Sequence, residues 1–175
     1  IAYSASENHC HNGVPKDEER LTLLFFINGL TPDRNRFPNK RVKDPKNYDN
    51  FIHDRIDELN KKIVAVKLNT AFYESRGAEG WTSMEKTINY LNKYYPELFT
   101  IADAKRGDIG NTARQYAYSI FEHFGFDCVT INPYMGRDSI DPFLENKEKG
   151  VFLLSKTSNP SAVILQDAKE NGIPI

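Results

Sequence analysis

The sequence of 175 residues lacks several features that would place it in a specialised class of protein. It contains no run approaching the roughly 20 apolar residues that a membrane-spanning helix needs, so we expect no membrane association. Its formal net charge of −1 provides no basic surface for sequence-independent binding of nucleic acid. Its two cysteines are too few for a disulfide framework. These absences predict a globular protein of the reducing cytoplasm.

The first 20 residues differ in character from the rest. Residues 1–20 are mostly polar and have neither helical nor strand periodicity, which predicts a poorly ordered N-terminal tail. His9, Cys10 and His11 could suggest a metal site, but a zinc site needs about four ligands and no second cluster follows. We therefore expect no metal, and we expect residues 21–175 to form one domain.

From residue 21 onward, short apolar runs alternate with amphipathic helical patterns. The expected strands are residues 21–27, 63–66, 98–102, 128–131 and 151–154. Apolar residues recur at helical spacing within residues 48–59, 84–95 and 113–124. The first helix should start at Asp44 and Pro45, and the second at a capping box formed by Thr82 and Glu85. Strands that alternate with helices predict parallel pairing with right-handed crossovers, and hence an α/β fold.

Two α/β architectures are compatible with this alternation. A doubly wound sheet usually has a glycine-rich phosphate turn after its first strand, but the sequence contains neither G-x-G-x-x-G nor a Walker pattern. A (β/α)8 TIM barrel instead places polar residues at the carboxyl ends of successive strands. Such residues here are Lys67, Asn69, Asp103, Lys105, Asn132, Ser155 and Lys156. We therefore predict a TIM barrel, of which about five βα units are present in residues 21–175.

The segment that follows the third expected strand concentrates charged residues. Asp103 and Lys105 are two residues apart, so the strand period of two directs both side chains to the same side of the sheet. Lys67 has the equivalent place one βα unit earlier, and Asp108 follows closely. A carboxylate that faces an anionic substrate group destabilises the ground state, and an ammonium group stabilises the carbanion that forms. The cluster suits decarboxylation without a cofactor, and a structural ion-pair network is the alternative.

Residues 103–113, DAKRGDIGNTA, resemble the signature of the orotidine 5′-phosphate decarboxylase family. Three further segments are similar to that family: AVKLNTAFYE at 65–74, NPYMGRDS at 132–139 and TSNPS at 157–161. The resemblance extends from about residue 23 to residue 167. It implies a carboxy-lyase that converts orotidine monophosphate to uridine monophosphate in de novo pyrimidine biosynthesis. It also implies that the reaction uses no metal and no organic cofactor.

The resemblance implies a role for each matching residue of the charged cluster. Lys105 would donate a proton to C6 of the pyrimidine after CO₂ leaves. Asp103 would press against the departing carboxylate, and Lys67 would orient Asp103 and contact the ribose. Asp108, with Thr112 beside it, would reach into the active site of a second subunit, so a homodimer is expected.

Two further positions are implied to bind the substrate. Ser158 would hydrogen-bond the pyrimidine ring, and Asn69 would support the Lys67 side of the pocket. Thr31 departs from the family, which usually has at this place an aspartate that bonds the ribose. The glycine-rich turn, glutamine and arginine that hold the substrate phosphate in the family do not occur before Ile175. Because remote binding energy also lowers the chemical barrier, we expect little or no decarboxylase activity from these 175 residues alone.

Two other functions stay open. The first is a magnesium-dependent sugar-phosphate decarboxylase of the same suprafamily, which needs a further carboxylate ligand at a strand end. Glu74 is the nearest residue of that type, but it lies well past its expected strand. The second is a degenerate copy that binds a partner without catalysing a reaction. Thr31 and the missing phosphate-binding residues favour the degenerate copy, and the intact charged cluster opposes it.

Overall fold

The computed structural model describes residues 24–26 and 48–174. The chain divides into two compact units, one of which ends at Phe152, while residues 153–174 belong to the other. The expected tail over residues 1–20, Thr31, and the expected helix start at Asp44 and Pro45 lie outside the described residues.

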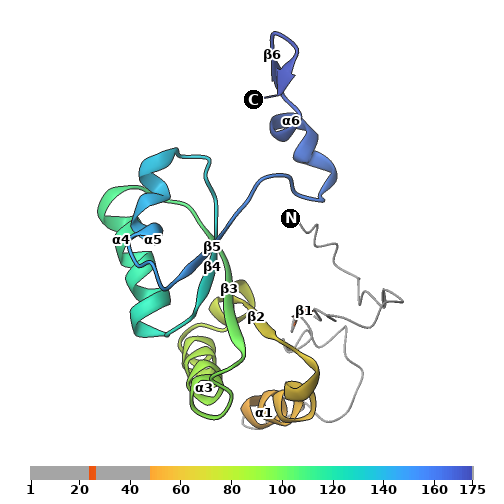
Figure 1. Ribbon diagram of the computed structural model, residues 1–175, viewed down its shortest axis with the longest axis vertical. Coiled ribbons are helices and arrows are strands. Elements are labelled where there is room, and N and C mark those ends of the chain that lie inside the picture. Colours follow the sequence, from red (N-terminus) through yellow and green to blue (C-terminus); the bar gives the residue numbers. More distant parts are fainter. Residues whose placement is uncertain (1–23, 27–47, 175) are drawn as a thin grey trace. The chain divides into compact units, whose positions relative to one another are not determined.

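The larger unit alternates strands and helices in the expected order (Figure 1). Its strands are β1 (Leu24–Phe26), β2 (Ala65–Asn69), β3 (Phe99–Arg106), β4 (Cys128–Ile131) and β5 (Gly150–Leu153), of which the last residue, Leu153, is counted with the other unit. Its α-helices are α1 (Tyr48–Leu59), α2 (Thr70–Glu74), α3 (Ala78–Tyr94), α4 (Gly110–Tyr118) and α5 (Asp141–Leu144). Its described part also contains the 3₁₀ turns η3 (Asn60–Lys62) and η5 (Arg137–Ser139) and the π-helical turn η4 (Ser119–His123). Within residues 48–174, none of the helices combines the length and the apolar character that crossing a bilayer requires.

The strand order distinguishes between the two α/β architectures. The five strands lie in the order β1-β2-β3-β4-β5, and the first three neighbouring pairs are parallel. A doubly wound sheet reverses direction at a switch point, so its strand order differs from its chain order. In a barrel, each strand is added on the same side of the preceding one. The predicted (β/α)8 class is therefore confirmed, with five strands in this sheet.

The two faces of the sheet have different partners. The main apolar core lies between the helices and one face, to which alternate strand residues contribute: Val66, Leu68, Ala102, Val129 and Ile131. The residues between them point to the other face, where Ala65, Ile101 and Cys128 form a small separate cluster. Packing of the helices on a single face is the arrangement of a barrel wall, and we call the other face the inner face of the sheet. The interpretation of Cys128 as a small core residue is confirmed, because it is a free thiol and 2% exposed.

The predicted start of the second helix is wrong. The capping box at Thr82 lies inside α3, which begins at Ala78 after Gly77. The sequence pattern does not reveal α2, and a sharp turn at Gly77, with φ of 64°, leads from α2 directly into α3. Gly80 then lets α3 approach the end of α2, because a Cβ atom at Gly80 would lie 1.8 Å from the carbonyl oxygen of Tyr73.

Two strands also differ from their predicted form. β3 continues past Ala102 to Arg106, so Asp103 and Lys105 lie within the strand rather than after it. β5 is predicted to be buried, but Phe152 and Leu153 are 50% and 51% exposed. The physical reason is that β5 is the last strand in the described sheet order and has a neighbouring strand, β4, on one side.

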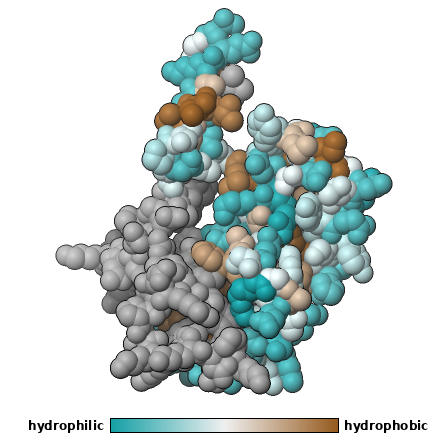
Figure 2. All heavy atoms as spheres, turned by 180° about the vertical axis from the view of Figure 1, so that it is seen from behind, coloured by the Kyte–Doolittle hydropathy of each residue, from teal (hydrophilic) through white to brown (hydrophobic). Residues whose placement is uncertain are grey.

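The second unit is described here by itself. Residues 153–174 contain η6 (Pro160–Ala162), α6 (Val163–Gln166) and the antiparallel pair β6 (Lys169–Glu170) and β7 (Ile173–Pro174). The amide N–H of Thr157 donates to Oε1 of Gln166 at 2.7 Å, which closes the loop before α6. Three apolar side chains of α6 are exposed and gather on the surface of this segment at the top of Figure 2: Val163, Ile164 and Leu165.

We predict that Gly80→Ala lowers the free energy of unfolding by about 1–3 kcal/mol, because the added methyl group must displace the backbone of Tyr73. The close contact outweighs the gain in helix propensity of about 1 kcal/mol. The matched control is Glu79→Ala at the exposed neighbouring position of α3, which should change stability by less than about 0.5 kcal/mol. Urea denaturation followed by circular dichroism measures both variants. Equal stability of the two variants would contradict the close packing of α2 on α3.

Candidate active site

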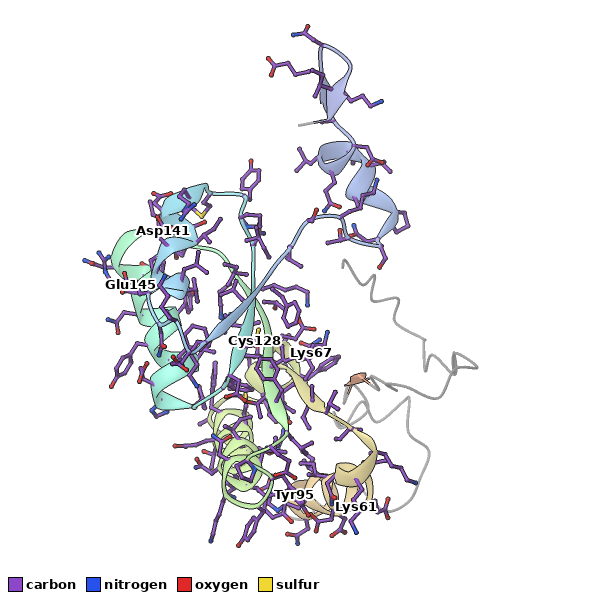
Figure 3. The ribbon with its side chains drawn as sticks, viewed as in Figure 1. Lys61, Lys67, Tyr95, Cys128, Asp141 and Glu145 are labelled. Atoms are coloured by element: carbon purple, nitrogen blue, oxygen red, sulfur yellow. The ribbon has the colours of Figure 1, made fainter. Side chains whose placement is uncertain are left out.

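Three charged side chains meet on the inner face of the sheet. Nζ of Lys67 lies 2.9 Å from Oδ2 of Asp103, and Nζ of Lys105 contacts Oδ1 of the same carboxylate. Each carboxylate oxygen therefore has its own ammonium partner. Figure 3 shows Lys67 at the sheet, away from Lys61 and Tyr95, which precede β2 and β3. The structure thus brings together three of the four charged residues that the sequence singles out.

The parallel register of β2 and β3 explains why the first pair forms. Asn69 pairs with Asp103 and Lys67 pairs with Ile101, so Lys67 is a diagonal neighbour of Asp103 across the two strands. Both residues occupy alternate strand positions between residues of the main core, which directs their side chains to the inner face. The pairing of Lys67 with Asp103 follows from strand register and alternation together.

Lys105 reaches the same carboxylate through an irregularity of β3. Ala102 pairs with Val129 and Arg106 pairs with Ile131, so β3 advances four residues where β4 advances two. Lys105 lies within this bulge and has φ of 48°, in the left-handed region that residues other than glycine rarely adopt. In a continuous strand, alternation alone would direct Lys105 to the same side as Asp103. Here the strand is irregular at Lys105, and the Lys105 side chain still contacts Asp103.

Thr130 of β4 lies opposite the bulge and contacts both residues. Its Oγ1 accepts the amide N–H of Lys105 at 2.9 Å and donates to Oδ1 of Asp103 at 3.1 Å. Sequence reasoning misses this residue, because a single threonine in the apolar run Cys128–Ile131 reads as an ordinary buried strand position. The available signal is that Thr130 alternates with core residues and so faces the same side as Asp103.

Burial and charge determine the protonation of the cluster. Burial raises the pKa of Asp103, whose side chain is 6% exposed, but hydrogen bonds from Lys105 and Lys67 outweigh burial and hold this pKa below its ordinary value. Burial lowers the pKa of Lys67, and the hydrogen bond and charge of Asp103 oppose this effect in part. Lys105 is 50% exposed, so its ammonium group is open to a ligand on the inner face. The site therefore presents an ionised carboxylate beside an accessible ammonium group.

The other four predicted site residues make different contacts. Oδ1 of Asn69 accepts the amide N–H of Ala71 at 3.2 Å and so caps α2. Oδ1 of Asp108 accepts the amide N–H of the following residue at 2.8 Å. Thr112 is exposed in the first turn of α4, and Ser158 belongs to the separate unit of residues 153–174. The catalytic role of Asp108 and the substrate-binding roles of Asn69, Thr112 and Ser158 stay predictions.

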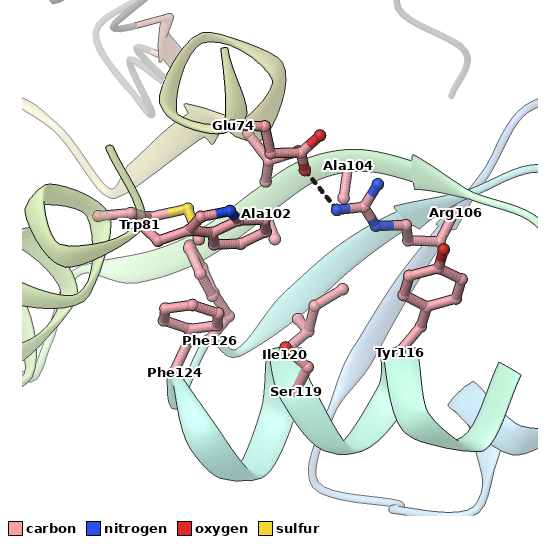
Figure 4. A pocket seen from close by; sticks show the side chains of 12 residues that line it. Glu74, Trp81, Ala102, Ala104, Arg106, Tyr116, Ser119, Ile120, Phe124 and Phe126 are labelled. Atoms are coloured by element: carbon pink, nitrogen blue, oxygen red, sulfur yellow. Dashed lines mark hydrogen bonds and ion pairs between the residues drawn. The ribbon is translucent and has the colours of Figure 1, made fainter. Parts of the chain in front are cut away.

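A pocket of about 310 Å³ lies on the helix side of β3 (Figure 4). An ion pair between Glu74 of α2 and Arg106 of β3 lines it, and the centre of the Tyr116 ring lies 4.9 Å from the Arg106 guanidinium carbon. The strand residues that line it alternate with Asp103 and Lys105, so the pocket and the charged cluster are on opposite faces of β3. The charged cluster, and not this pocket, is therefore the candidate active site.

Comparisons with known proteins identify relatives of this chain. The sequence model of the orotidine 5′-phosphate decarboxylase / HUMPS family matches residues 44–175. The chain is 46% identical over 148 residues to the orotidine 5′-phosphate decarboxylase of Flavobacterium johnsoniae, covering 85% of this chain and 54% of that protein. It is 47% identical over 145 residues to the protein of the same name from Christiangramia forsetii, covering 83% and 53%.

A solved structure is similar as well. The structure of Leishmania donovani OMP decarboxylase matches with a TM-score of 0.70 and 36% identity, covering 77% of this chain and 52% of that chain. The chain thus spans about half the length of the curated relatives that it matches.

We predict that Asp103→Asn lowers the free energy of unfolding at neutral pH by about 3–5 kcal/mol, because it removes the negative charge that faces the buried ammonium group of Lys67. The control is Asp141→Asn, whose carboxylate is 52% exposed and pairs with Arg137 on the surface. The control substitution should cost less than about 1 kcal/mol. Urea denaturation measures both variants.

The difference between wild type and Asp103→Asn should also depend on pH. Because the pKa of Asp103 in the folded chain is below its ordinary value of 3.8, its stabilising effect is complete above that value. The effect is lost as the pH falls through and below 3.8, where the carboxylate becomes protonated in the folded chain as well. A stability difference that stays constant over this acid range would contradict the assigned ionisation of Asp103.

Proposed function

This chain belongs to the orotidine 5′-phosphate decarboxylase / HUMPS family, and on that premise we propose that it carries the charged centre of an orotidine 5′-phosphate decarboxylase. The reaction releases CO₂ from orotidine 5′-phosphate and forms uridine 5′-phosphate, without metal or organic cofactor, in cytoplasmic pyrimidine biosynthesis. The observation that supports this proposal most directly is the pair of ammonium groups, one at each oxygen of the buried Asp103 carboxylate.

The proposed chemistry uses this geometry in two steps. The Asp103 carboxylate lies next to the carboxylate of the bound substrate, and their repulsion raises the energy of the ground state. The bond between C6 and the carboxylate carbon breaks, CO₂ leaves, and the electron pair stays on C6, where the Lys105 ammonium group stabilises it. Lys105 then transfers a proton to C6, and solvent reprotonates the resulting amine. Lys67 holds Asp103 in place and contacts the ribose.

The remaining predicted residues complete the proposed site. Asn69 supports the Lys67 side of the pocket, and Ser158 hydrogen-bonds the pyrimidine ring. Asp108 and Thr112 reach into the site of a second subunit, so the working unit is a homodimer. In support, Thr112 is exposed in the first turn of α4 and is available to a partner.

The two other functions have less support. A magnesium-dependent sugar-phosphate decarboxylase needs a further carboxylate beside Asp103, but Glu74 pairs with Arg106 on the opposite face of β3. A non-catalytic copy has no need of two ammonium groups around one buried carboxylate. The charged cluster and the names of the relatives therefore favour cofactor-free decarboxylation.

The first test is decarboxylation by the product of the natural gene, followed as the fall in absorbance of orotidine 5′-phosphate. We predict that Lys105→Ala lowers kcat by about 100-fold or more, because the proton donor to C6 is lost. Lys93→Ala, which removes an exposed lysine of α3, is the matched control and should leave kcat unchanged. The 175-residue chain should turn over substrate much more slowly than the relatives, because it spans about half of their length.

Two outcomes of this assay would contradict the proposal. Full activity of Lys105→Ala would exclude Lys105 as the proton donor, and a natural gene product with no activity would favour the non-catalytic copy. Loss of activity on addition of a chelator would favour the magnesium-dependent enzyme.

The second test concerns the homodimer. We predict that Lys105→Ala and Asp108→Asn are each inactive, and that mixing them restores roughly a quarter of the wild-type activity. Half of the randomly formed dimers would contain one chain of each kind, and each mixed dimer would have one site with both residues intact. Light scattering measures whether the protein has the mass of a dimer. Failure of the mixture to regain activity, with mixed dimers present, would exclude a site shared between subunits.

A further inference from the structure

Thr130 is placed where it can act on two residues of the charged cluster at once. Its side chain is buried, with 8% of the residue exposed, on the inner face of β4. Because β3 advances four residues between Ala102 and Arg106 while β4 advances two, the whole bulge from Asp103 to Lys105 lies opposite this single residue. A threonine elsewhere on β4 could not contact both ends of the bulge.

The first contact holds the backbone of Lys105. The bulge interrupts the regular ladder between β3 and β4, so the amide N–H of Lys105 needs a partner other than a strand carbonyl. Oγ1 of Thr130 accepts this N–H at 2.9 Å. Lys105 has φ of 48°, a strained conformation for a residue with a side chain, which persists where neighbouring contacts hold it. The hydrogen bond to Thr130 is one of the contacts that hold Lys105 in this conformation.

The second contact orients the carboxylate of Asp103. A hydroxyl group has one proton to donate, and Oγ1 of Thr130 donates it to Oδ1 of Asp103 at 3.1 Å. The same Oδ1 contacts the Lys105 ammonium group, while Oδ2 faces Lys67. Because the N–H of Lys105 uses an acceptor site of the hydroxyl, the Thr130 proton is directed toward the carboxylate. The threonine thus fixes the rotation of the carboxylate as well as its position.

We propose that Thr130 is a positioning residue for decarboxylation: one hydroxyl sets the distance between the Asp103 carboxylate and the Lys105 ammonium group by bonding the side chain of the first and the backbone of the second. This inference rests on the proposed function. Thr130 acts through Asp103 and Lys105 and needs no contact with the substrate. If Thr130 only contributed to stability, its replacement by valine would leave the rate of the chemical step unchanged.

The test compares two substitutions at Thr130 with a matched threonine elsewhere. Thr130→Val keeps the shape and removes both hydrogen bonds, whereas Thr130→Ser keeps the hydroxyl. Thr87→Val is the control, because Thr87 is 0% exposed and bonds the carbonyl of Ser83 within α3, away from the charged cluster. Circular dichroism and urea denaturation verify that each variant is folded.

Kinetics of the natural gene product give the first readout. Thr130→Val should lower kcat roughly tenfold or more, with a change in KM below about threefold, because the substrate still binds but the proton donor and carboxylate are misplaced. Thr130→Ser should retain kcat within about threefold of wild type, and Thr87→Val should leave it unchanged. A Thr130→Val variant with wild-type kcat, or a Thr130→Ser variant as impaired as Thr130→Val, would overturn the inference.

A second readout does not depend on activity. Carbon NMR of side-chain carboxyl groups gives the pKa of Asp103 in the folded 175-residue chain, where Lys67 and Lys105 are the charged groups that face it among residues 48–174. Removing the Thr130 donor should raise this pKa in Thr130→Val and leave it near the wild-type value in Thr130→Ser. An unchanged pKa in Thr130→Val would overturn the inference. If the wild-type protein proved inactive, the proposed function would fail while this titration still tested the part of Thr130.

Discussion

The Asp103 carboxylate is the constraint on which the described structure depends. A carboxylate with 6% exposure has little water around it, so it stays ionised only where opposite charges and hydrogen bonds replace that water. Three neighbours supply the replacement: Lys67 from β2, Lys105 from the bulge in β3, and Thr130 from β4. Their meeting requires that three consecutive strands lie side by side and in parallel, with β2 and β3 in regular register and a bulge in β3 opposite β4.

Along each strand, residues that pack into the apolar core alternate with residues that form the charged cluster on the inner face. Val66 and Ala102 pack into the helix-covered core, while Lys67 and Asp103, their sequence neighbours, face the inner side. The helix side also holds β3 at its carboxyl end, because Arg106 pairs with Glu74 of α2 there. The charged side chains therefore lie on strands whose other face packs against helices. This packing limits the movement of the strands, and so of the charged side chains.

Much of this arrangement could be predicted from the sequence, and the errors have physical causes. Periodicity located all five strands and the three main helices, because apolar residues must repeat at the period of the element that buries them. The capping box at Thr82 was misleading, because a cap competes with the tertiary packing that starts α3 at Ala78. Thr130 was missed, because its importance depends on a bulge in a neighbouring strand that no local pattern encodes.

By itself, the sequence determined the α/β class, the parallel order of the βα units and which charged side chains face the inner side of the sheet. These features follow from local periodicity and residue type. The tertiary structure alone decided how those charges combine. The register of β2 against β3 selects Lys67 as the partner of Asp103, and the bulge opposite Thr130 places Lys105 at the other oxygen. Such pairings depend on distances between strands that are about 25–35 residues apart in the chain, and those distances exist only after the sheet has formed.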